Sequence, residues 1–395
     1  FIPRTEAALA GAMLFAALAV HTESVAWISG RSDILAALFM TLALLAVFRW
    51  EDSAAARDRS GNGNTSPTWL ALPAAGLFTV LALLSKEVAL VLVPLYALLA
   101  WLKPRPHSDM RWRDRLAPLT ALGAGTLIYL ALRWYAISGL STGMVEQTFS
   151  PWTPSGLATV AGCVLRYLGK LTLPLHLSAD FELQPFQSAA TPLALAAIAG
   201  GVCLLALTAW LARRDRAMGF ALAWVWVGLA PVLHFVPIAE VTAERFLFVP
   251  SIGFCMVAGL AVDRLAGRDR GPLPAPALLA VCAIAVWVAG QGLLTLDRNA
   301  DWRSDRTLAL SSVESAPRTL RSHLALGMVY ENERLLKRAQ QRYARAVELA
   351  PRSRTARIRL GETALQMGRP ESALVHLLKV QPQDSRDPIL LTNVA

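Results

Sequence analysis

The sequence predicts an all-α fold in two parts, a polytopic bundle of membrane helices followed by an α-solenoid of short repeats. Three observations predict it. The 395 residues are 55% hydrophobic and 17% charged, with a mean hydropathy of +0.44, whereas an ordinary soluble domain has about 25% charged residues. The apolar residues gather in runs long enough to cross a bilayer. After the last run, the sequence repeats with a period of 34 residues.

The apolar runs define nine expected membrane spans within a membrane domain over residues 1–296. At a rise of about 1.5 Å per residue, about 20 residues cross a hydrocarbon core of about 30 Å. The spans are expected at residues 5–20, 32–48, 69–85, 87–102, 116–136, 191–211, 219–238, 247–263 and 273–296.

A tenth apolar segment, residues 155–177, carries Arg166 and Lys170 one turn apart in its middle. A charge at the bilayer centre costs about 2.5–3.5 kcal/mol even on lenient insertion scales. We therefore expect this segment to be interfacial or re-entrant rather than spanning.

The positions of the basic residues predict which side each loop faces. Short loops rich in Lys and Arg stay cytoplasmic, and "KPRPHSDMRWRDR" from Lys103 and "RRDR" from Arg213 are both strongly basic. Because both loops are then expected on the cytoplasmic side, an even number of spans must separate them. This number is even only if segment 155–177 does not cross the membrane. The outer side therefore holds "HTESVAWISGRSD", "SKE", "PLHLSAD", "HFVPIAEVTAERF" and all residues after Leu296. The costly ionisable groups gather on one side, as a shared site requires.

The C-terminal repeats have the spacing of tetratricopeptide repeats. "PRTLRSHLALGMVYENERLLKRAQQRYARAVELA" is followed by "PRSRTARIRLGETALQMGRPESALVHLLKVQPQD". Small and large apolar residues recur 34 positions apart where paired helices pack, as in Leu326/Leu360, Gly327/Gly361, Ala339/Ala373 and Ala346/Val380.

Two repeats bury little core, because each contacts only its neighbours. We expect residues 297–316 to form a linker or partial repeat, and the repeats of residues 317–395 to continue beyond Ala395. The chain begins at Phe1 without a signal-peptide pattern, so we expect it to be cut at both ends.

Composition also limits the classes of partner. The net charge of +10 lies in short loops and in the C-terminal part, without an arginine-rich face interleaved with aromatic residues. This pattern favours anionic membrane lipids over nucleic acid. The cysteines lack metal-site spacing and are interpreted as packing residues, namely Cys163, Cys203, Cys255 and Cys282.

Six motifs in a fixed order carry a family resemblance: "HTESVAWISGRSDILAALF", "LLSKEVALVLVPLYALL", "YLALRWYAISG", "RYLGKLTLPLHLSADF", "AERFLFVPSIGF" and "NADWRS" before the repeats. Together they resemble the transmembrane and tetratricopeptide repeat-containing O-mannosyltransferases and their bacterial relatives. The resemblance implies a GT-C fold that transfers a mannose-like sugar from a polyprenyl-phosphate donor to a protein Ser or Thr hydroxyl. It places the reaction on the outer or luminal side of the membrane. The high Ala, Arg and Leu content and the compact loops predict a bacterial inner membrane with the repeats in the periplasm, and an endoplasmic reticulum membrane fits the same topology.

The sequence departs from the family at two places. Leu18 and Ala19 stand where the family has His-Pro before "HTE". The family's acidic catalytic motif lies in the first external loop, which is expected upstream of Phe1. The catalytic residue is therefore not identified, and Glu23 and Asp33 are supporting candidates. The chain is either a truncated transferase or a catalytically inactive protein.

Sugar transfer from a lipid phosphate needs a carboxylate for the acceptor proton and cations for the departing phosphate. Arginine suits a phosphate through its planar fork and lysine through its point charge. We expect the phosphate to be bound first by Arg245, then by Lys86 and Arg31, with Arg166 and Lys170 at headgroup depth. The supporting residues are expected to be His21, Glu87, Asp180, Glu244 and His234.

Each of these residues also has a structural interpretation. Lys86 and Glu87 form a short turn, and the two cations of segment 155–177 reach headgroups. Neighbouring charges form ion pairs that fix loop ends, namely Arg31 with Asp33 and Glu244 with Arg245. The segment 21–23 caps the following helix, and the Trp residues near span ends, such as Trp27, form an interfacial belt. No cofactor is assigned from the sequence. A divalent Mg²⁺ or Mn²⁺ ion stays open as an alternative, although one His and one carboxylate are a weak ligand set.

Three functions stay open from the sequence. The first is a membrane glycosyltransferase whose repeats bind a polypeptide acceptor or partner protein. The second is a non-catalytic membrane-anchored scaffold for protein–protein interaction. The third is a transferase that uses a glycan or lipid acceptor.

Overall fold

The computed structural model describes residues 4–60, 70–102, 112–137, 149–174, 177–179, 185–235, 242–267 and 271–380. Within these ranges every regular element is helical, so the predicted all-α fold is confirmed. The chain divides into two compact units. The bundle unit comprises Phe1–Leu175 and Pro185–Thr295, and the repeat unit comprises His176–Gln184 and Leu296–Ala395.

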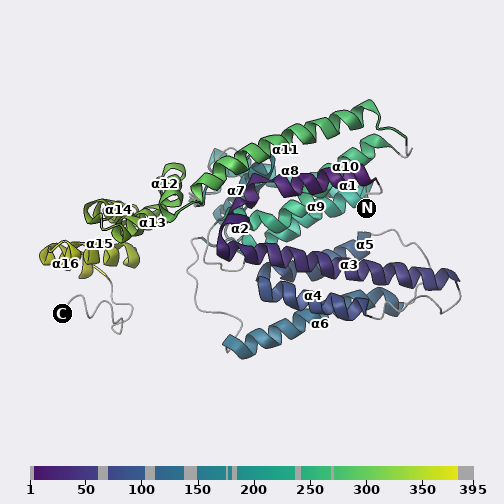
Figure 1. The fold of residues 1–395 in the computed structure, drawn as a ribbon, viewed down its shortest axis with the longest axis horizontal. Helices are drawn as coiled ribbons and strands as arrows, with labels where there is room; N and C mark the ends of the chain where they lie inside the picture. The colour runs from purple at the N-terminus through teal and green to yellow at the C-terminus, as the bar shows by residue number, and fades with distance from the viewer. Residues whose placement is uncertain are drawn as a thin grey trace. The chain divides into compact units, whose positions relative to one another are not determined.

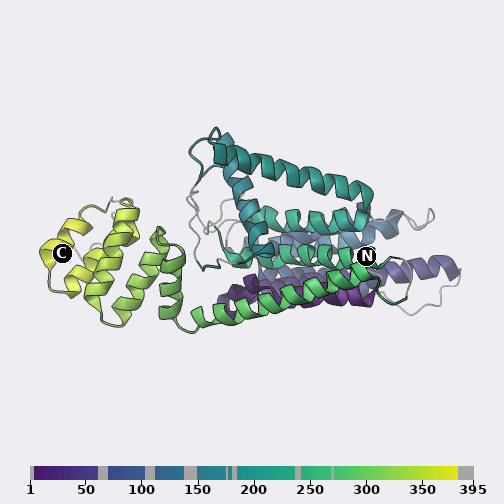
Figure 2. The same ribbon diagram turned by 90° about the horizontal axis from the view of Figure 1, so that it is seen from above.

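The bundle unit is built mainly from long helices (Figures 1 and 2). Its α-helices are α1 (Thr5–Ala17), α2 (Thr22–Ala26), α3 (Arg31–Ser60), α4 (Ala71–Ser85), α5 (Leu92–Leu102), α6 (Trp112–Ile137), α7 (Pro154–Thr172), α8 (Pro192–Arg214), α9 (Arg216–Leu229), α10 (Phe248–Ala266) and α11 (Ala275–Asp301), the last of which contains the unit boundary. Five 3₁₀ turns adjoin them: η1 (Ala19–His21), η2 (Ile28–Gly30), η3 (Glu87–Val91), η4 (Ala230–Val232) and η5 (Glu244–Leu247).

Apolar helices coincide with all nine expected spans. In the described part of the chain, five helices are long and apolar enough to cross a membrane: Ile28–Ala56, Leu116–Ala136, Pro192–Arg214, Glu244–Ala266 and Ala275–Asp301. A sixth is the pair Thr5–Ala17 and Ala19–Ala26, bent by 48°. The remaining three are shorter apolar helices, namely Ala71–Ser85, Glu87–Leu102 and Arg216–Val232. Helix α7, within the segment expected not to span, is not among the candidates.

Glycines let the bundle helices approach closely. A Cβ at Gly125 on α6 would lie 2.5 Å from the carbonyl oxygen of Gly76 on α4, and one at Gly253 on α10 would lie 2.5 Å from that of Ala221 on α9. A Cβ at Gly11 on α1 would lie 2.8 Å from the Cys255 oxygen on α10. Small residues at such crossings allow the backbones to pack, as is typical of membrane helices. Figure 1 shows α3, α4 and α6 side by side, in agreement with their contacts.

The turn between α8 and α9 is expected to make the stability of the bundle depend on pH. The Asp215 carboxylate accepts from the backbone N–H groups of Ala217 and Met218, at 2.9 and 3.1 Å, and from Arg264 Nε at 2.6 Å. The hydrogen bond from Arg264 is the main cause that holds the pKa of Asp215 below its usual range. The folded state therefore binds this proton more weakly than the unfolded chain does. The stabilisation is full above the unfolded pKa of about 3.9 and is lost as the pH falls through the lower folded pKa.

We expect Asp215→Asn to reduce the acid sensitivity of the bundle. Asparagine keeps the cap but does not titrate, so the variant should lose less thermal stability than the wild type between neutral pH and about pH 3. The pair is partly exposed, so the difference should be about 1 kcal/mol or less. Thermal unfolding in nanodiscs at several pH values measures it, and equal acid losses would contradict the assignment.

The repeat unit contains helices α12 (Asp305–Ser315), α13 (Leu320–Asn332), α14 (Leu336–Leu349), α15 (Arg354–Gln366) and α16 (Pro370–Leu377). Helices α13 and α15 begin 34 residues apart. Helix α13 packs against α14, α15 packs against α16, and α12 packs against α13. The core contains Leu326, Tyr330, Ala339, Tyr343 and Leu360. The Ser304 hydroxyl caps α12 by accepting from the backbone N–H of Thr307 at 3.1 Å.

Gly327→Ala is expected to destabilise the repeat unit by about 1–3 kcal/mol, as over-packing of a core does. The added Cβ would lie 2.4 Å from Cε1 of Tyr343, whose side chain is fully buried. Gly292→Ala on α11 is the control, because no atom lies within 4 Å of its Cβ position. Its expected effect has the opposite sign, since alanine favours a helix interior over glycine. Thermal unfolding of both variants followed by circular dichroism tests this contrast.

Candidate functional site

Five segments of the bundle unit bring six charged side chains together. They are the turn containing α2, the first turn of α3, the junction between α4 and η3, the last part of α7, and η5. We call their residues the charged cluster: Glu23, Asp33, Lys86, Lys170, Glu244 and Arg245. Each anion pairs with a cation from a distant part of the chain, so the cluster is electrically balanced.

Glu23 and Arg245 form the most buried pair of the cluster. Their side chains are 2% and 10% exposed. Both carboxylate oxygens of Glu23 accept from Arg245, one from the guanidinium and one from the backbone N–H at 2.9 Å. The Trp27 ring centroid lies 4.8 Å from the guanidinium carbon, a cation–π contact. Trp27, interpreted above as an interfacial belt residue, therefore covers the ion pair.

The turn that carries Glu23 depends on Gly30. A Cβ at Gly30 would lie 2.8 Å from the Glu23 carbonyl oxygen and 2.9 Å from the Ser24 Cα. The Gly30 N–H also donates to the Trp27 carbonyl at 2.9 Å. Because no larger residue fits against this backbone, the glycine fixes how the turn places Glu23 beside Arg245.

His21 lies at the edge of this turn, where its ring packs against other side chains of the bundle. Its Nε2 is 2.9 Å from the Ser251 hydroxyl, and its ring contacts Phe15 and Phe248 at centroid distances of 4.7 and 4.6 Å. The predicted side-chain cap of the following helix is not formed, because the Thr22 hydroxyl donates back to the Ala19 carbonyl at 2.8 Å. His21 thus links the turn to α10.

Asp33 and Lys86 form the second pair. Lys86 Nζ lies 2.6 Å from both carboxylate oxygens of Asp33, and the two side chains are 24% and 4% exposed. The predicted pairing of Arg31 with Asp33 is wrong: Arg31 is exposed, and no described residue pairs with its side chain. Glu87 stands apart from the cluster, 57% exposed, and accepts from Arg133 at 2.6 Å.

Lys170 and Glu244 form the third pair, with Nζ 3.0 Å from Oε1 of the fully buried carboxylate. The neighbours Glu244 and Arg245 each pair with a residue from another segment, Glu244 with Lys170 and Arg245 with Glu23. Arg166 lies on the exposed side of α7. The sequence motifs quoted above contain all six residues of the charged cluster, but they do not predict which of these residues pair.

Two further predicted supporting residues are His234 and Asp180. His234 is buried in the left-handed region at φ 63°, with its ring centroid 5.1 Å from that of Phe149. Asp180 lies outside the described residues. Among the residues that the structure describes, no group of three or more His, Cys, Asp or Glu side chains is arranged to hold a metal ion.

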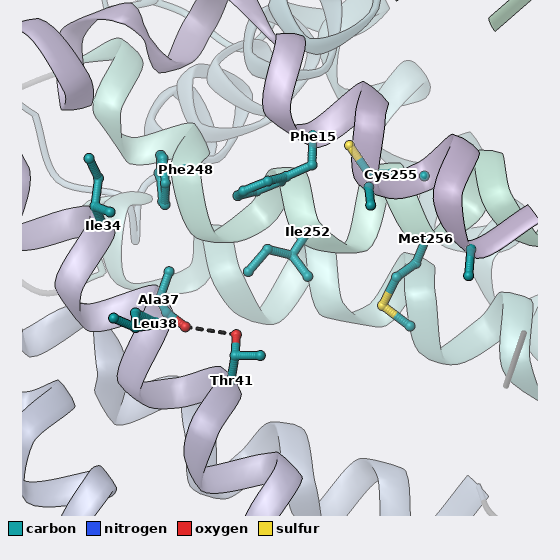
Figure 3. A pocket seen from close by; sticks show the side chains of 12 residues that line it. Phe15, Ile34, Ala37, Leu38, Thr41, Phe248, Ile252, Cys255 and Met256 are labelled. Atoms are coloured by element: carbon teal, nitrogen blue, oxygen red, sulfur yellow. Dashed lines mark hydrogen bonds between the residues drawn. The ribbon is translucent and has the colours of Figure 1, made fainter. Parts of the chain in front are cut away.

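An apolar slot of about 470 Å³ lies between α1, α3 and α10 (Figure 3). Its walls continue directly from the elements that hold the charged cluster. Ile34 follows Asp33 on α3, Phe248 follows η5, and Phe15 contacts His21. The Thr41 hydroxyl is satisfied by the Ala37 carbonyl at 2.8 Å, so it adds little polarity. The complete lining is Ala8, Gly11, Ala12, Phe15, Ile34, Ala37, Leu38, Thr41, Phe248, Ile252, Cys255 and Met256.

Comparison with known proteins finds similar proteins that are named as O-mannosyl-transferases. The chain is 22% identical over 391 residues to "Protein O-mannosyl-transferase TMTC3" of Mus musculus, covering 92% of this chain and 41% of that protein. It is 25% identical over 358 residues to "Protein O-mannosyl-transferase TMTC4" of Homo sapiens, covering 81% and 46%. It is 28% identical over 173 residues to "Protein O-mannosyl-transferase Tmtc3" of Drosophila melanogaster, covering 43% and 18%.

The chain thus spans less than half the length of these relatives. No family model and no solved structure matches it. The predicted resemblance is confirmed by the named relatives: over most of its length, the chain is related to the transmembrane and tetratricopeptide repeat-containing O-mannosyltransferases.

Proposed function

We propose that the protein is a membrane glycosyltransferase that moves a mannose-like sugar from a polyprenyl-phosphate donor to a Ser or Thr hydroxyl of a protein. The observation that carries the proposal is the charged cluster next to the apolar slot. A lipid phosphate has an anionic head and a hydrocarbon chain, and these two features adjoin here. The printed names of the relatives supply the class of reaction.

The cluster suits a phosphate because its cations are held in place before the ligand binds. Fixed donors stabilise the charge that develops on a leaving group without reorganising during the reaction. Lys86 is the most exposed of the three paired cations, at 24% against 15% for Lys170 and 10% for Arg245. We assign the first contact with the phosphate to Lys86, and the deeper contact to Arg245.

The carboxylates of the cluster act as positioning residues in this proposal. Glu23 holds the Arg245 guanidinium, and Asp33 holds the Lys86 ammonium through both oxygens. Their negative charges balance the buried cations, because an unpaired buried charge strongly lowers the stability of the folded protein. The residue that accepts the hydroxyl proton is not assigned to either of them.

The reaction is proposed on the outer side of a bacterial inner membrane, or on the luminal side of the endoplasmic reticulum. The distribution of Lys and Arg in the loops supports this side for the charged cluster. The repeats are proposed to recruit a polypeptide acceptor or partner, because stacked helical repeats present an extended binding surface.

Sugar transfer to a Ser/Thr peptide tests the proposal. The protein in nanodiscs is mixed with polyprenyl-phosphate-mannose and the peptide, and mass spectrometry measures the mannosylated product. Arg245→Lys keeps the charge but loses the planar fork, and we expect transfer to fall by about 100-fold. Arg214→Ala, at the end of α8, is the control and should retain transfer. If the wild-type protein binds the donor but transfers no sugar, the result would instead favour the alternative function, a non-catalytic membrane-anchored scaffold.

A further inference from the structure

The two repeats contain the same turn with different residues at its centre. Arg334 and Gly368 lie 34 positions apart, at φ 61° and 70°, and each turn makes the same backbone hydrogen bonds. The N–H of Arg334 donates to Glu331, and that of the next residue donates to Tyr330, at 3.0 and 2.8 Å. At Gly368 the equivalent distances are both 2.9 Å.

Glycine is the residue that suits this left-handed position, because a side chain there brings its Cβ close to the following carbonyl. The second repeat has glycine and the first has arginine in an equivalent turn. The turn itself therefore gives no reason for an arginine at position 334. The side chain of Arg334 is what distinguishes this turn from the equivalent turn of the second repeat.

The Arg334 side chain lines a polar pocket of about 320 Å³ within the repeat unit, between α13 and α15. The other lining residues are Met328, Glu331, Asn332, Arg359 and Gln366. Arg334 is exposed, and no described residue forms a hydrogen bond or ion pair with its guanidinium.

The carboxylate that lines this pocket is already engaged. Glu331 Oε2 accepts from the Tyr343 hydroxyl at 2.7 Å, and Oε1 accepts from Gln366 Nε2 at 2.9 Å. Arg359 lies 3.5 Å from Glu362, at the limit of a hydrogen bond. The pocket therefore offers a ligand the N–H donors of two guanidinium groups and of the Asn332 amide.

The charge of the surrounding unit has the same sign. Residues 297–380 contain 16 Lys and Arg against 9 Asp and Glu, a net charge of +7 out of +10 for the whole chain. A positive surface attracts acidic partners and speeds their association. Asn332 and Gln366 occupy equivalent positions 34 residues apart, so the pocket presents amides in register with the repeat, which suits an extended peptide backbone.

We propose that this pocket binds an acidic, extended polypeptide segment, with Arg334 and Arg359 holding its Asp or Glu carboxylates. Arg334 occupies a position that suits glycine, and its guanidinium is the group that this position supplies to the ligand. The inference rests on the proposed recruiting role of the repeats, but not on the sugar-transfer chemistry. The partner is identified by its carboxylates, since paired N–H donors of arginine match them.

Arg334→Gly separates binding from folding. The variant is expected to unfold at a higher temperature than the wild type, because glycine relieves the left-handed position. It is expected to bind a fluorescent ten-residue peptide containing four glutamates about tenfold or more weakly, as loss of a charged hydrogen bond predicts. The full chain in nanodiscs is used, and fluorescence anisotropy gives the affinity.

Two controls make the result specific. Arg345→Ala on α14 removes an exposed arginine paired with Glu348, and should leave the affinity unchanged. The same peptide with glutamine in place of glutamate should bind at least about tenfold more weakly to the wild type. Equal binding of both peptides, or unchanged binding by Arg334→Gly, would overturn the proposal. Arg245→Lys should keep peptide binding even where it loses transfer, so failure of the sugar chemistry is distinguishable.

Discussion

Replacing Glu23 by alanine is expected to lower the free energy of unfolding of the bundle by about 3–5 kcal/mol, the effect of removing one partner of a buried ion pair. Glu23 is 2% exposed and accepts both the guanidinium and the backbone N–H of Arg245. The substitution leaves two donors buried without their acceptor. Thermal and denaturant unfolding in nanodiscs measures the loss.

Glu87→Ala is the matched control for this prediction. Glu87 also pairs with an arginine, at 2.6 Å, but it is 57% exposed. Water replaces its contact, so the expected loss is about 0–1 kcal/mol. A loss for Glu23→Ala no larger than that for Glu87→Ala would contradict the burial of the pair.

A double variant separates stability from function at the same pair. Glu23→Ala with Arg245→Met removes the uncompensated charge, and we expect much of the lost stability to return. Sugar transfer should stay low, because the guanidinium that contacts the phosphate in the proposed function is absent. Recovery of transfer together with stability would show that Arg245 acts only in folding.

Lys86→Met is expected to have the second large effect. It leaves the Asp33 carboxylate, 4% exposed, without the ammonium that lies 2.6 Å from both its oxygens. We expect a stability loss of about 3–5 kcal/mol and a fall in sugar transfer of about 100-fold. Unfolding and transfer assays on the same nanodisc preparation give both values.

Adding Asp33→Asn to Lys86→Met distinguishes the two roles of the lysine. A neutral amide costs less to bury than an unpaired carboxylate, so the double variant should regain stability. If Lys86 contacts the donor phosphate, transfer should remain about 100-fold reduced. A double variant as active as the wild type would reject that role, and would leave Lys86 as the partner of Asp33 alone.

The fold followed from the sequence because its signals are local. An apolar run such as residues 191–211 is itself the reason that α8 is a membrane-type helix, whatever it packs against. The charges at Arg166 and Lys170 likewise predict that α7 does not span, and α7 is not among the candidate spans of the described residues. The 34-residue period located α13 and α15 because each repeat must present the same packing surface to its neighbours.

The pairing of the charged residues did not follow from the sequence. Neighbours such as Glu244 and Arg245, or Arg31 and Asp33, were expected to pair. Residues one or two positions apart on a helical turn do not face each other. The ion pairs of the charged cluster join residues that lie 222, 53 and 74 positions apart along the chain, namely Glu23–Arg245, Asp33–Lys86 and Lys170–Glu244.

The helical class, the apolar segments, the repeat period and the motifs whose charges form the cluster could all be predicted from the amino-acid order. The structure was needed to show which carboxylate holds which cation, that Trp27 covers Arg245, and that an apolar slot adjoins them. It was also needed to show that Arg334 has the left-handed conformation that Gly368 has in the next repeat, and that Arg334 lines a pocket. Hydropathy and periodicity are properties of one segment, whereas a site is made by the packing of several.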